Sequence, residues 1–349
     1  MTIVQNMIVD TFGAFVGKHS ERLTVTQEGK TVTQVPLLYL ETLTIASRGV
    51  SLSADAIFEC TERGIPIHFI NSRGVPYASL YSSGLTGTVA TRRAQLQAYQ
   101  TYLGLRLAIA ISLAKVQNQS NLLKYIAKYR KEIQADLYQE LRIRAGEVLD
   151  QILQIEGMLR YPEVQDGTAC IDDLRAELMG YEGMAAQRYW GAVKMTIPGQ
   201  YGFIGREGRG AKDPINSALN YGYGILYSQV ERCLVLAGLD PYAGFLHVDR
   251  PGKPSLTLDF IEEFRQPVVD RTVIAMANKG MVFEQDERNL LTKETRRCLT
   301  EKIFEHLDAT AQYEGKRQSL RSIMQTQARH LATFLRAERP VYEGFTMSW

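Results

Sequence analysis

Residues 76–116 read PYASLYSSGLTGTVATRRAQLQAYQTYLGLRLAIAISLAKV, and within them the chain changes character. Before Gly84 and Gly87, short runs rich in Val, Ile, Thr and Tyr alternate with turn residues, which is typical of β-strands. After the two glycines, apolar residues recur at three- and four-residue spacing, which predicts amphipathic helices. We therefore expect an α+β fold of two domains, a small β domain with one short helix at residues 1–85 and a larger all-α domain at residues 86–349.

Local signals place the individual elements. Ser53 is a candidate N-cap for a helix at residues 53–63, and the runs at 28–30 and 72–74 are typical hairpin turns. Further along, Asp213 is a candidate N-cap with Pro214 at the first helical position. The predicted strands are residues 3–10, 22–27, 31–36, 43–46, 65–71 and 76–81, and the predicted helices of the second domain are residues 91–116, 120–155, 172–193, 213–238, 255–278, 295–307 and 315–337.

The composition is that of an ordinary globular protein. The chain has 349 residues, of which 45% are hydrophobic and 22% are charged, and these values exclude a disordered, collagen-like or disulfide-scaffold protein. Forty basic and 38 acidic residues leave a formal net charge of +2. Any surface for nucleic acid must therefore be a local patch.

The cysteines and the apolar segments indicate a cytoplasmic protein with no membrane partner. Cys60, Cys170, Cys233 and Cys298 lie far apart and form no CxxC pair, so they suit a reducing compartment and give no zinc-site spacing. The N-terminus lacks the pattern of a signal peptide. The most apolar stretch, residues 103–116, is too short to span a bilayer.

Glu182 lies between two glycines in a predicted helix, in the sequence Gly180-Tyr181-Glu182-Gly183. Each glycine costs a helix about 1 kcal/mol relative to alanine. The close approach of another backbone or of a substrate is the usual reason for such a cost. The alternative is tight helix packing with a solvated Glu182, and the residues alone leave both interpretations open.

A histidine and a run of carboxylates follow. His247 comes after an apolar run, where a lone histidine is more often structural than a ligand. Asp259 and Glu262 are spaced i, i+3, and Asp259 and Glu263 are spaced i, i+4, so a helix would place these carboxylates on one face. Such like charges repel unless a cation lies between them, although a charge run usually forms a solvated face.

Taken together, these residues favour phosphodiester chemistry. One imidazole and two or three carboxylates form a mixed nitrogen and oxygen site that suits magnesium or manganese, and such a cation polarises a phosphoryl group. Residues 201–212 form a glycine-rich loop with arginines and aromatics, which suits contacts with phosphates and bases. A plain surface linker is the alternative for this loop.

Five motifs occur in an order that resembles a known family. The motifs are GYEG at 180–183, DPINSALNYGYG at 213–224, AGLDP at 237–241, GFLH at 244–247 and SLTLDFIEEFR at 255–265. They resemble those of the CRISPR-associated integrases (endonuclease/integrase subunits), the metal-dependent proteins that insert new spacers into CRISPR arrays for antiviral defence.

The resemblance implies roles for individual residues. Glu182, His247 and Glu262 match the ligands of one divalent cation, Mg²⁺ or Mn²⁺, and Asp259 matches a neighbouring acidic position that supports the metal or positions a water. The residues that match DNA-binding positions are Arg188, Arg206, Arg209, Lys212, Asn216, Asn220, Tyr223 and Tyr227.

The resemblance also implies a reaction and partners. The 3′-OH of a short DNA fragment would attack a phosphodiester of the CRISPR repeat by transesterification, and water in its place would give endonuclease cleavage. Relatives form a homodimer through the β domain, and a small ferredoxin-like CRISPR adaptation partner bridges two dimers into a heterohexamer.

Three other functions remain open from the residues. A metal-dependent nuclease or resolvase outside CRISPR would cut branched DNA and never join ends. A DNA-binding scaffold without activity would tolerate loss of the four acidic and imidazole residues. A metalloenzyme acting on a small molecule is the third, and the glycine- and arginine-rich loop argues mildly against it.

Overall fold

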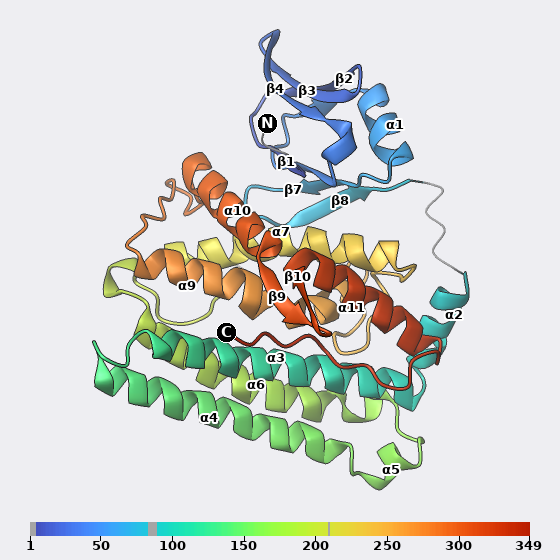
Figure 1. Ribbon diagram of the computed structural model, residues 1–349, viewed down its shortest axis with the longest axis vertical. Coiled ribbons are helices and arrows are strands. Elements are labelled where there is room, and N and C mark those ends of the chain that lie inside the picture. The colour runs from blue at the N-terminus through green and yellow to red at the C-terminus, as the bar shows by residue number, and fades with distance from the viewer. Residues whose placement is uncertain (1–4, 83–88, 209) are drawn as a thin grey trace.

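The computed structural model describes residues 5–82, 89–208 and 210–349 (Figure 1). The expected domain boundary at residue 85, with Gly84 and Gly87, lies outside the described residues, as does Arg209.

The N-terminal part contains two four-stranded sheets in the described residues. The first sheet has the order β1-β5-β7-β8, and only its β7–β8 pair is antiparallel. The second sheet has the order β4-β3-β2-β6. The strands are β1 (Asn6–Val9), β2 (Phe15–His19), β3 (Arg22–Gln27), β4 (Lys30–Pro36), β5 (Thr42–Ile45), β6 (Ser51–Leu52), β7 (Ile67–Ile70) and β8 (Pro76–Leu80). The predicted strands are confirmed, whereas β2 and β6 were missed because each carries few apolar residues.

The turn and cap signals of this part are also confirmed. Glu28 and Gly29, at φ +50° and +77°, form the turn between β3 and β4. The Ser53 hydroxyl accepts a hydrogen bond from the Ala56 amide and caps α1 (Ala54–Glu62).

The remaining chain is predominantly helical. In Figure 1, α3, α4 and α6 lie side by side in the lower part, and α7, α9, α10 and α11 lie between them and the β domain. The elements are α2 (Val89–Ala98), α3 (Tyr102–Lys128), α4 (Ala135–Met158), α5 (Pro162–Gln165), α6 (Ile171–Thr196), α7 (Pro214–Leu236), α8 (Ser255–Phe260), α9 (Arg271–Asn278), α10 (Lys293–Asp308), β9 (Thr310–Tyr313), β10 (Lys316–Ser319) and α11 (Leu320–Leu335). Asp213 caps α7 as predicted, because its carboxylate accepts from the Asn216 amide.

The predicted break at residues 117–119 is wrong, because α3 runs through it. Polar residues there are buried and hydrogen-bonded: the Asn118 amide donates to the carbonyls of Glu263 and Phe345, both at 2.9 Å. The Ser120 hydroxyl donates to the Ala145 carbonyl of α4. A polar run was therefore interpreted as a loop although it lies inside the core.

Two other helix predictions are also corrected. Residues 255–278 do not form one helix, because α8 ends in a 3₁₀ turn (Ile261–Glu263) and a wide π turn (Arg265–Asp270) precedes α9. Pro267 lies inside this turn and has no amide hydrogen to donate. Residues 310–319 form a hairpin, with Glu314 and Gly315 at positive φ, so α11 starts later than expected and the second domain is not strictly all-α.

The two parts meet where the loop between β7 and β8 lies against α7. A Cβ added at Gly224 would be 1.5 Å from the Gly74 carbonyl oxygen, and a Cβ at Gly74 would be 2.6 Å from the Tyr221 Cα. Only glycine permits this approach of two backbones.

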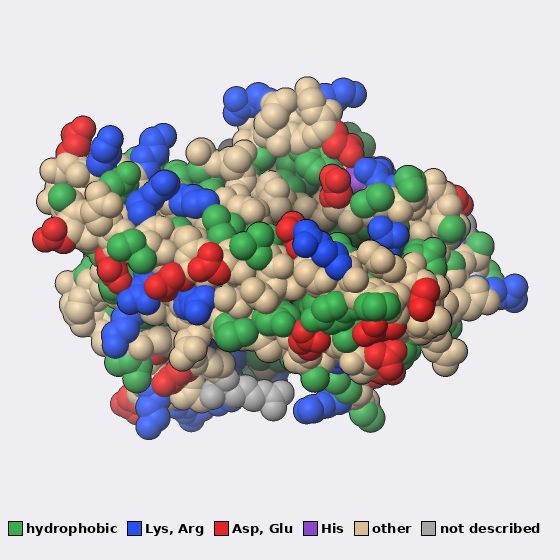
Figure 2. Space-filling model, turned by 90° about the horizontal axis from the view of Figure 1, so that it is seen from below, with side chains coloured by type: hydrophobic (Ala, Val, Ile, Leu, Met, Phe, Trp, Pro, Cys, Tyr) green, Lys and Arg blue, Asp and Glu red, His purple; other side chains and the backbone are tan. Residues whose placement is uncertain are grey.

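The face of the molecule shown in Figure 2 agrees with the small formal net charge of the sequence, which is +2. The face seen from below, which includes α4, mixes basic, acidic and hydrophobic side chains, and neither sign of charge dominates it (Figure 2). Within the described residues, no helix is long and apolar enough to cross a membrane. The four cysteines are free thiols.

We predict that Gly224→Ala lowers the free energy of unfolding by about 3 kcal/mol or more, because the new methyl group overlaps a backbone oxygen. Gly146→Ala in α4 is the matched control, since nothing in the described structure lies within 4 Å of its added Cβ. This control raises stability by up to about 1 kcal/mol. Urea denaturation measures both, and equal shifts for the two variants would contradict the predicted contact.

Candidate active site

Glu182 lies on the buried face of α6. It falls between Leu178 and Ala185 in the apolar stripe of the helix and is only 6% exposed. The interpretation of a solvated Glu182 is therefore wrong. Close packing does not explain Gly180 and Gly183 either, because no described atom lies within 4 Å of a Cβ added at either glycine.

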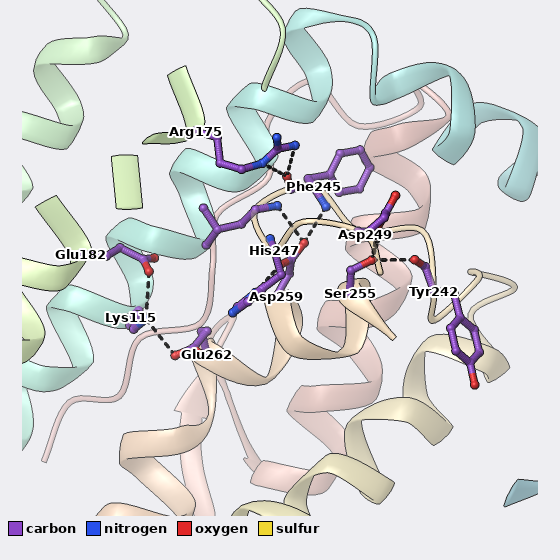
Figure 3. Close-up of polar contacts among 12 residues, drawn as sticks. Lys115, Arg175, Glu182, Tyr242, Phe245, His247, Asp249, Ser255, Asp259 and Glu262 are labelled. Atoms are coloured by element: carbon purple, nitrogen blue, oxygen red, sulfur yellow. Dashed lines mark hydrogen bonds and ion pairs between the residues drawn. The ribbon is translucent and has the colours of Figure 1, made fainter. Parts of the chain in front are cut away.

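His247 lies on the loop that precedes α8. A Cβ added at Gly244 would be 2.6 Å from the Ser255 backbone, so this glycine lets the loop lie against the start of α8. The Ser255 hydroxyl accepts from the Gly244 amide at 2.9 Å and lies 2.5 Å from both the Tyr242 carbonyl and an Asp249 oxygen. These contacts fix both ends of the loop (Figure 3).

Asp259 is fully buried and holds the same loop in place. Its Oδ2 accepts from the amides of Phe245 and Leu246, at 2.6 and 3.0 Å. Its Oδ1 accepts from the His247 amide at 2.8 Å and lies 2.7 Å from His247 Nδ1. The structure thus places Asp259 behind the imidazole, where it orients the ring and leaves Nε2 for a ligand.

Glu262 is 2% exposed and lies between two cations. Its Oε1 accepts from Arg265 Nη1 at 2.6 Å, and its Oε2 lies 3.2 Å from Lys115 Nζ. Burial opposes ionisation of this carboxyl, but the charges of Arg265, Lys115 and His247 outweigh burial and lower its pKa to about 2. Glu262 is therefore a carboxylate at neutral pH.

Lys115 connects Glu262 with Glu182. Its Nζ donates to Glu182 Oε2 at 2.9 Å, so one ammonium lies between two carboxylates from different parts of the fold (Figure 3). Burial disfavours the charged lysine, but the two glutamates outweigh burial and raise the Lys115 pKa. The site is a cluster of buried charges in which α3, α6 and the turn after α8 meet.

Glu263 points away from this cluster, although the spacing predicted that it would share a face with Asp259. Its carboxylate accepts from the Tyr342 hydroxyl at 2.6 Å and the Phe345 amide at 2.7 Å. Burial raises its pKa to about 8, against these hydrogen bonds. Glu262 and Glu263 are consecutive, so their side chains point about 100–120° apart in an α-helix or a 3₁₀ turn. Both are buried, so the alternative of a solvated charge run is wrong.

The predicted DNA-binding residues of α7 hold the loop at residues 202–212. Asn216 Oδ1 accepts from Arg206 Nη1 at 3.1 Å and from the Glu207 amide at 2.9 Å. Asn220 Oδ1 accepts from Arg206 Nη2 at 2.7 Å. Arg206 also lies over Tyr223, with its guanidinium carbon 5.3 Å from the ring centre.

Tyr223 joins this loop to the charged cluster. Its other cationic neighbour, Arg265, lies 4.1 Å from the ring centre, and its hydroxyl donates to Asp270. Burial raises the Asp270 pKa to about 6, against hydrogen bonds from Tyr223 and Tyr189. A series of side-chain contacts therefore connects Arg206, through Tyr223 and Arg265, with Glu262.

Three further predicted DNA-binding residues make no described hydrogen bond or ion pair with Lys115, Glu182 or Glu262. Arg188 donates to the Glu147 carbonyl of α4 at 2.8 Å, Tyr227 is partly buried on α7, and Lys212 is exposed. Their role in binding DNA stays a prediction, as does that of Arg209.

The donor set fits a hard divalent cation. Glu182 Oε1 is buried and has no hydrogen-bond partner in the described structure. A cationic ammonium already lies between the two glutamates, and the neighbouring imidazole is oriented by a carboxylate, as metal-binding histidines are. Among the described residues, no three acidic, cysteine or histidine side chains are close enough to ligate one ion, and the Lys115 ammonium lies between the two glutamates.

The sequence interpretation missed Lys115 and gave Arg265 no role. A lone lysine follows the apolar run at 103–114 on a helix that is buried along much of its length. The position of this single lysine on a buried helix could have indicated an ion pair, because a charge on a buried face needs a partner.

Residues 7–305 match the family described as CRISPR associated protein Cas1. The chain belongs to the Cas1 family. Its Cas1 relatives include the CRISPR-associated endonuclease Cas1 1 of Archaeoglobus fulgidus, which is 36% identical over 98% of this chain and 99% of the relative. The protein of the same name from Francisella tularensis subsp. novicida is 32% identical over 99% of this chain and 100% of the relative.

Solved structures of a Cas1 protein and of a casposase have a similar fold. A Cas1 protein from Thermotoga maritima superposes with a TM-score of 0.74 at 20% identity, covering 97% of this chain and 99% of that one. A casposase bound to integration product superposes with a TM-score of 0.77 at 21% identity, covering 97% and 93%. The expected family and fold class are confirmed.

We predict that Asp259→Asn lowers the free energy of unfolding by about 2 kcal/mol, because an amide nitrogen would face backbone donors that now bind a carboxylate. Asp150→Asn, at an exposed position on α4, changes stability by less than about 0.5 kcal/mol. Thermal melting of both variants measures the difference. Equal melting temperatures would show that Asp259 does not hold the loop.

Proposed function

We propose that this chain is a metal-dependent DNA integrase and endonuclease of CRISPR adaptation. The observation that carries the proposal is the pair of buried carboxylates, Glu182 and Glu262, beside an imidazole that Asp259 orients. Family membership supports it, since the Cas1 relatives are named CRISPR-associated endonucleases.

In the proposed mechanism, Glu182, Glu262 and His247 would hold one Mg²⁺ or Mn²⁺. Such a cation polarises a phosphodiester and eases ionisation of an attacking hydroxyl. Asp259 keeps the imidazole in its metal-binding orientation, and Arg265 keeps Glu262 ionised and fixed.

The reaction is a transesterification. The 3′-oxygen of the DNA fragment forms a bond to phosphorus as the bond to the leaving 3′-oxygen breaks. The attacking hydroxyl gives its proton to solvent, and the leaving 3′-oxygen takes a proton from solvent. One phosphodiester replaces another, so no energy-rich cofactor is needed. With water as nucleophile, the same site hydrolyses DNA.

The loop at residues 202–212 would contact the DNA backbone. Arg206 and Lys212 supply positive charge there, and Arg206 is anchored by Asn216 and Asn220. One solved structure of similar fold is a TtCas1–DNA complex, which agrees with a DNA partner.

The proposed joining activity is tested with purified protein, Mn²⁺, a short duplex with free 3′-hydroxyls and a plasmid carrying a repeat, with the small CRISPR adaptation partner added. We predict that Glu262→Gln and His247→Ala each lower the yield of fragment–plasmid product at least about 100-fold, because each loses a metal ligand. EDTA abolishes the product in the wild type.

Glu301→Gln, at an exposed position on α10, is the matched control and retains full joining. If the wild type cuts branched DNA but never joins ends with its partner present, the function is that of a nuclease or resolvase outside CRISPR.

We further propose that the chain is a homodimer through its β domain and binds a ferredoxin-like CRISPR adaptation protein. This small domain exposes several large apolar side chains, and Phe12, Val32, Leu38 and Phe58 are between 61% and 80% exposed. Where exposed apolar side chains form one patch they mark an interaction surface, and these four residues are candidates for it. Two solved structures of similar fold are Cas6-RT-Cas1–Cas2 complexes, which agrees with a separate adaptation partner.

We predict that Leu38→Asp converts the dimer into a monomer, because a buried carboxylate without a partner destabilises an interface. Light scattering after gel filtration measures the mass. Ile133→Asp, at a position 83% exposed outside the β domain, leaves the dimer intact. A dimer that survives Leu38→Asp and dissociates with Ile133→Asp would place the interface elsewhere.

A further inference from the structure

The two proposed metal-binding glutamates are already bridged by a cation that belongs to the chain. Lys115 Nζ lies 2.9 Å from Glu182 Oε2 and 3.2 Å from Glu262 Oε2. The lysine side chain is 14% exposed, and those of the two glutamates are 8% and 3% exposed. The ammonium is therefore a poorly hydrated charge between two carboxylates that would otherwise repel each other.

The two cations of the cluster differ in how firmly they are held. Arg265 binds Glu262 Oε1 at 2.6 Å and stacks on the Tyr223 ring at 4.1 Å, so its planar group is fixed on two sides. Lys115 reaches the cluster from α3 on a flexible four-carbon stem, and both of its ion pairs are with Glu182 and Glu262. Lys115 is therefore held in the cluster by its two ion pairs, whereas Arg265 is also held by the Tyr223 ring.

We propose that Lys115 is a positioning residue that holds the metal-free site together and is displaced when the divalent cation binds. Its ammonium takes the place of the cation between Glu182 and Glu262, and it competes with the metal for these two ligands. The inference rests on the metal site proposed above.

Size and charge both favour the displacement. An ammonium contacts a carboxylate oxygen at about 2.8–2.9 Å, whereas Mg²⁺ binds oxygen at about 2.0–2.1 Å. Both cannot lie at one point between the same two oxygens. Lys115 and Arg265 also balance the two glutamates, so a divalent ion added beside both would leave excess positive charge in a poorly hydrated site.

Two consequences follow for the protein without DNA. The ammonium weakens binding of the divalent cation, because the metal must first break two ion pairs. It also stabilises the metal-free fold, because a glutamate pair without it contains an uncompensated buried charge.

The test compares Mn²⁺ binding by the full-length wild type, Lys115→Met and Lys128→Met, without DNA. Electron paramagnetic resonance of free Mn²⁺ and titration calorimetry both give the dissociation constant. We expect Lys115→Met to bind Mn²⁺ about tenfold more tightly than the wild type. Lys128→Met removes an exposed lysine from the same helix and leaves the constant unchanged.

A second variant keeps the test decisive if Lys115→Met does not fold. Lys115→Arg keeps the positive charge and adds a fork of donors that grips carboxylates more firmly, so we expect Mn²⁺ to bind about tenfold more weakly. Equal affinity in the wild type and in the folded variants overturns the inference, as does weaker binding by Lys115→Met.

Stability in EDTA gives a readout that does not depend on metal. Lys115→Met lowers the melting temperature, and Lys115→Met/Glu182→Gln restores much of the loss, since the charge and its partner are removed together. No recovery in the double variant overturns the pairing. If neither the wild type nor Lys115→Met binds Mn²⁺, the metal site itself is absent and the proposed function fails with the inference.

Discussion

The interaction on which the site depends is the pair of ion contacts from Lys115 to Glu182 and Glu262. These three side chains come from α3, from α6 and from the turn after α8. Burying two carboxylates so close together is unfavourable unless a cation compensates them. A cation is thus required at this point whether it is the ammonium of the metal-free protein or a divalent ion.

The surrounding fold holds this cluster through three further acidic groups. Asp259 fixes the loop of His247, Glu263 binds the C-terminal segment, and Asp270 accepts from the hydroxyls of Tyr189 and Tyr223. Each of these carboxylates is completely buried and already has hydrogen-bond partners. Glu182 and Glu262 therefore face the cations, Asp259 and Glu263 hold backbone amides, and Asp270 holds tyrosine hydroxyls.

Much of this arrangement could be predicted from local signals and from motif order. The caps at Ser53 and Asp213 depend only on adjacent residues, and both were predicted correctly. Glu182, His247 and Glu262 were picked out by their departure from helical periodicity and by the resemblance to the family.

The rest depends on contacts between distant residues. The buried Asn118 makes α3 continuous because it finds partners more than 140 positions away. Glu262 and Glu263 also find partners far away in the sequence, Lys115 for the first and the segment at residues 342–345 for the second. Lys115 was missed for the same reason, since its two partners lie 67 and 147 positions further along the chain.

The most direct test is the anomalous diffraction of crystals soaked in Mn²⁺, recorded above the manganese absorption edge. The account predicts one strong peak within bonding distance of Glu182, Glu262 and His247 Nε2, with the Lys115 ammonium moved away from both glutamates. A peak elsewhere, or a Lys115 ammonium still bridging the two carboxylates beside a fully bound ion, would contradict it.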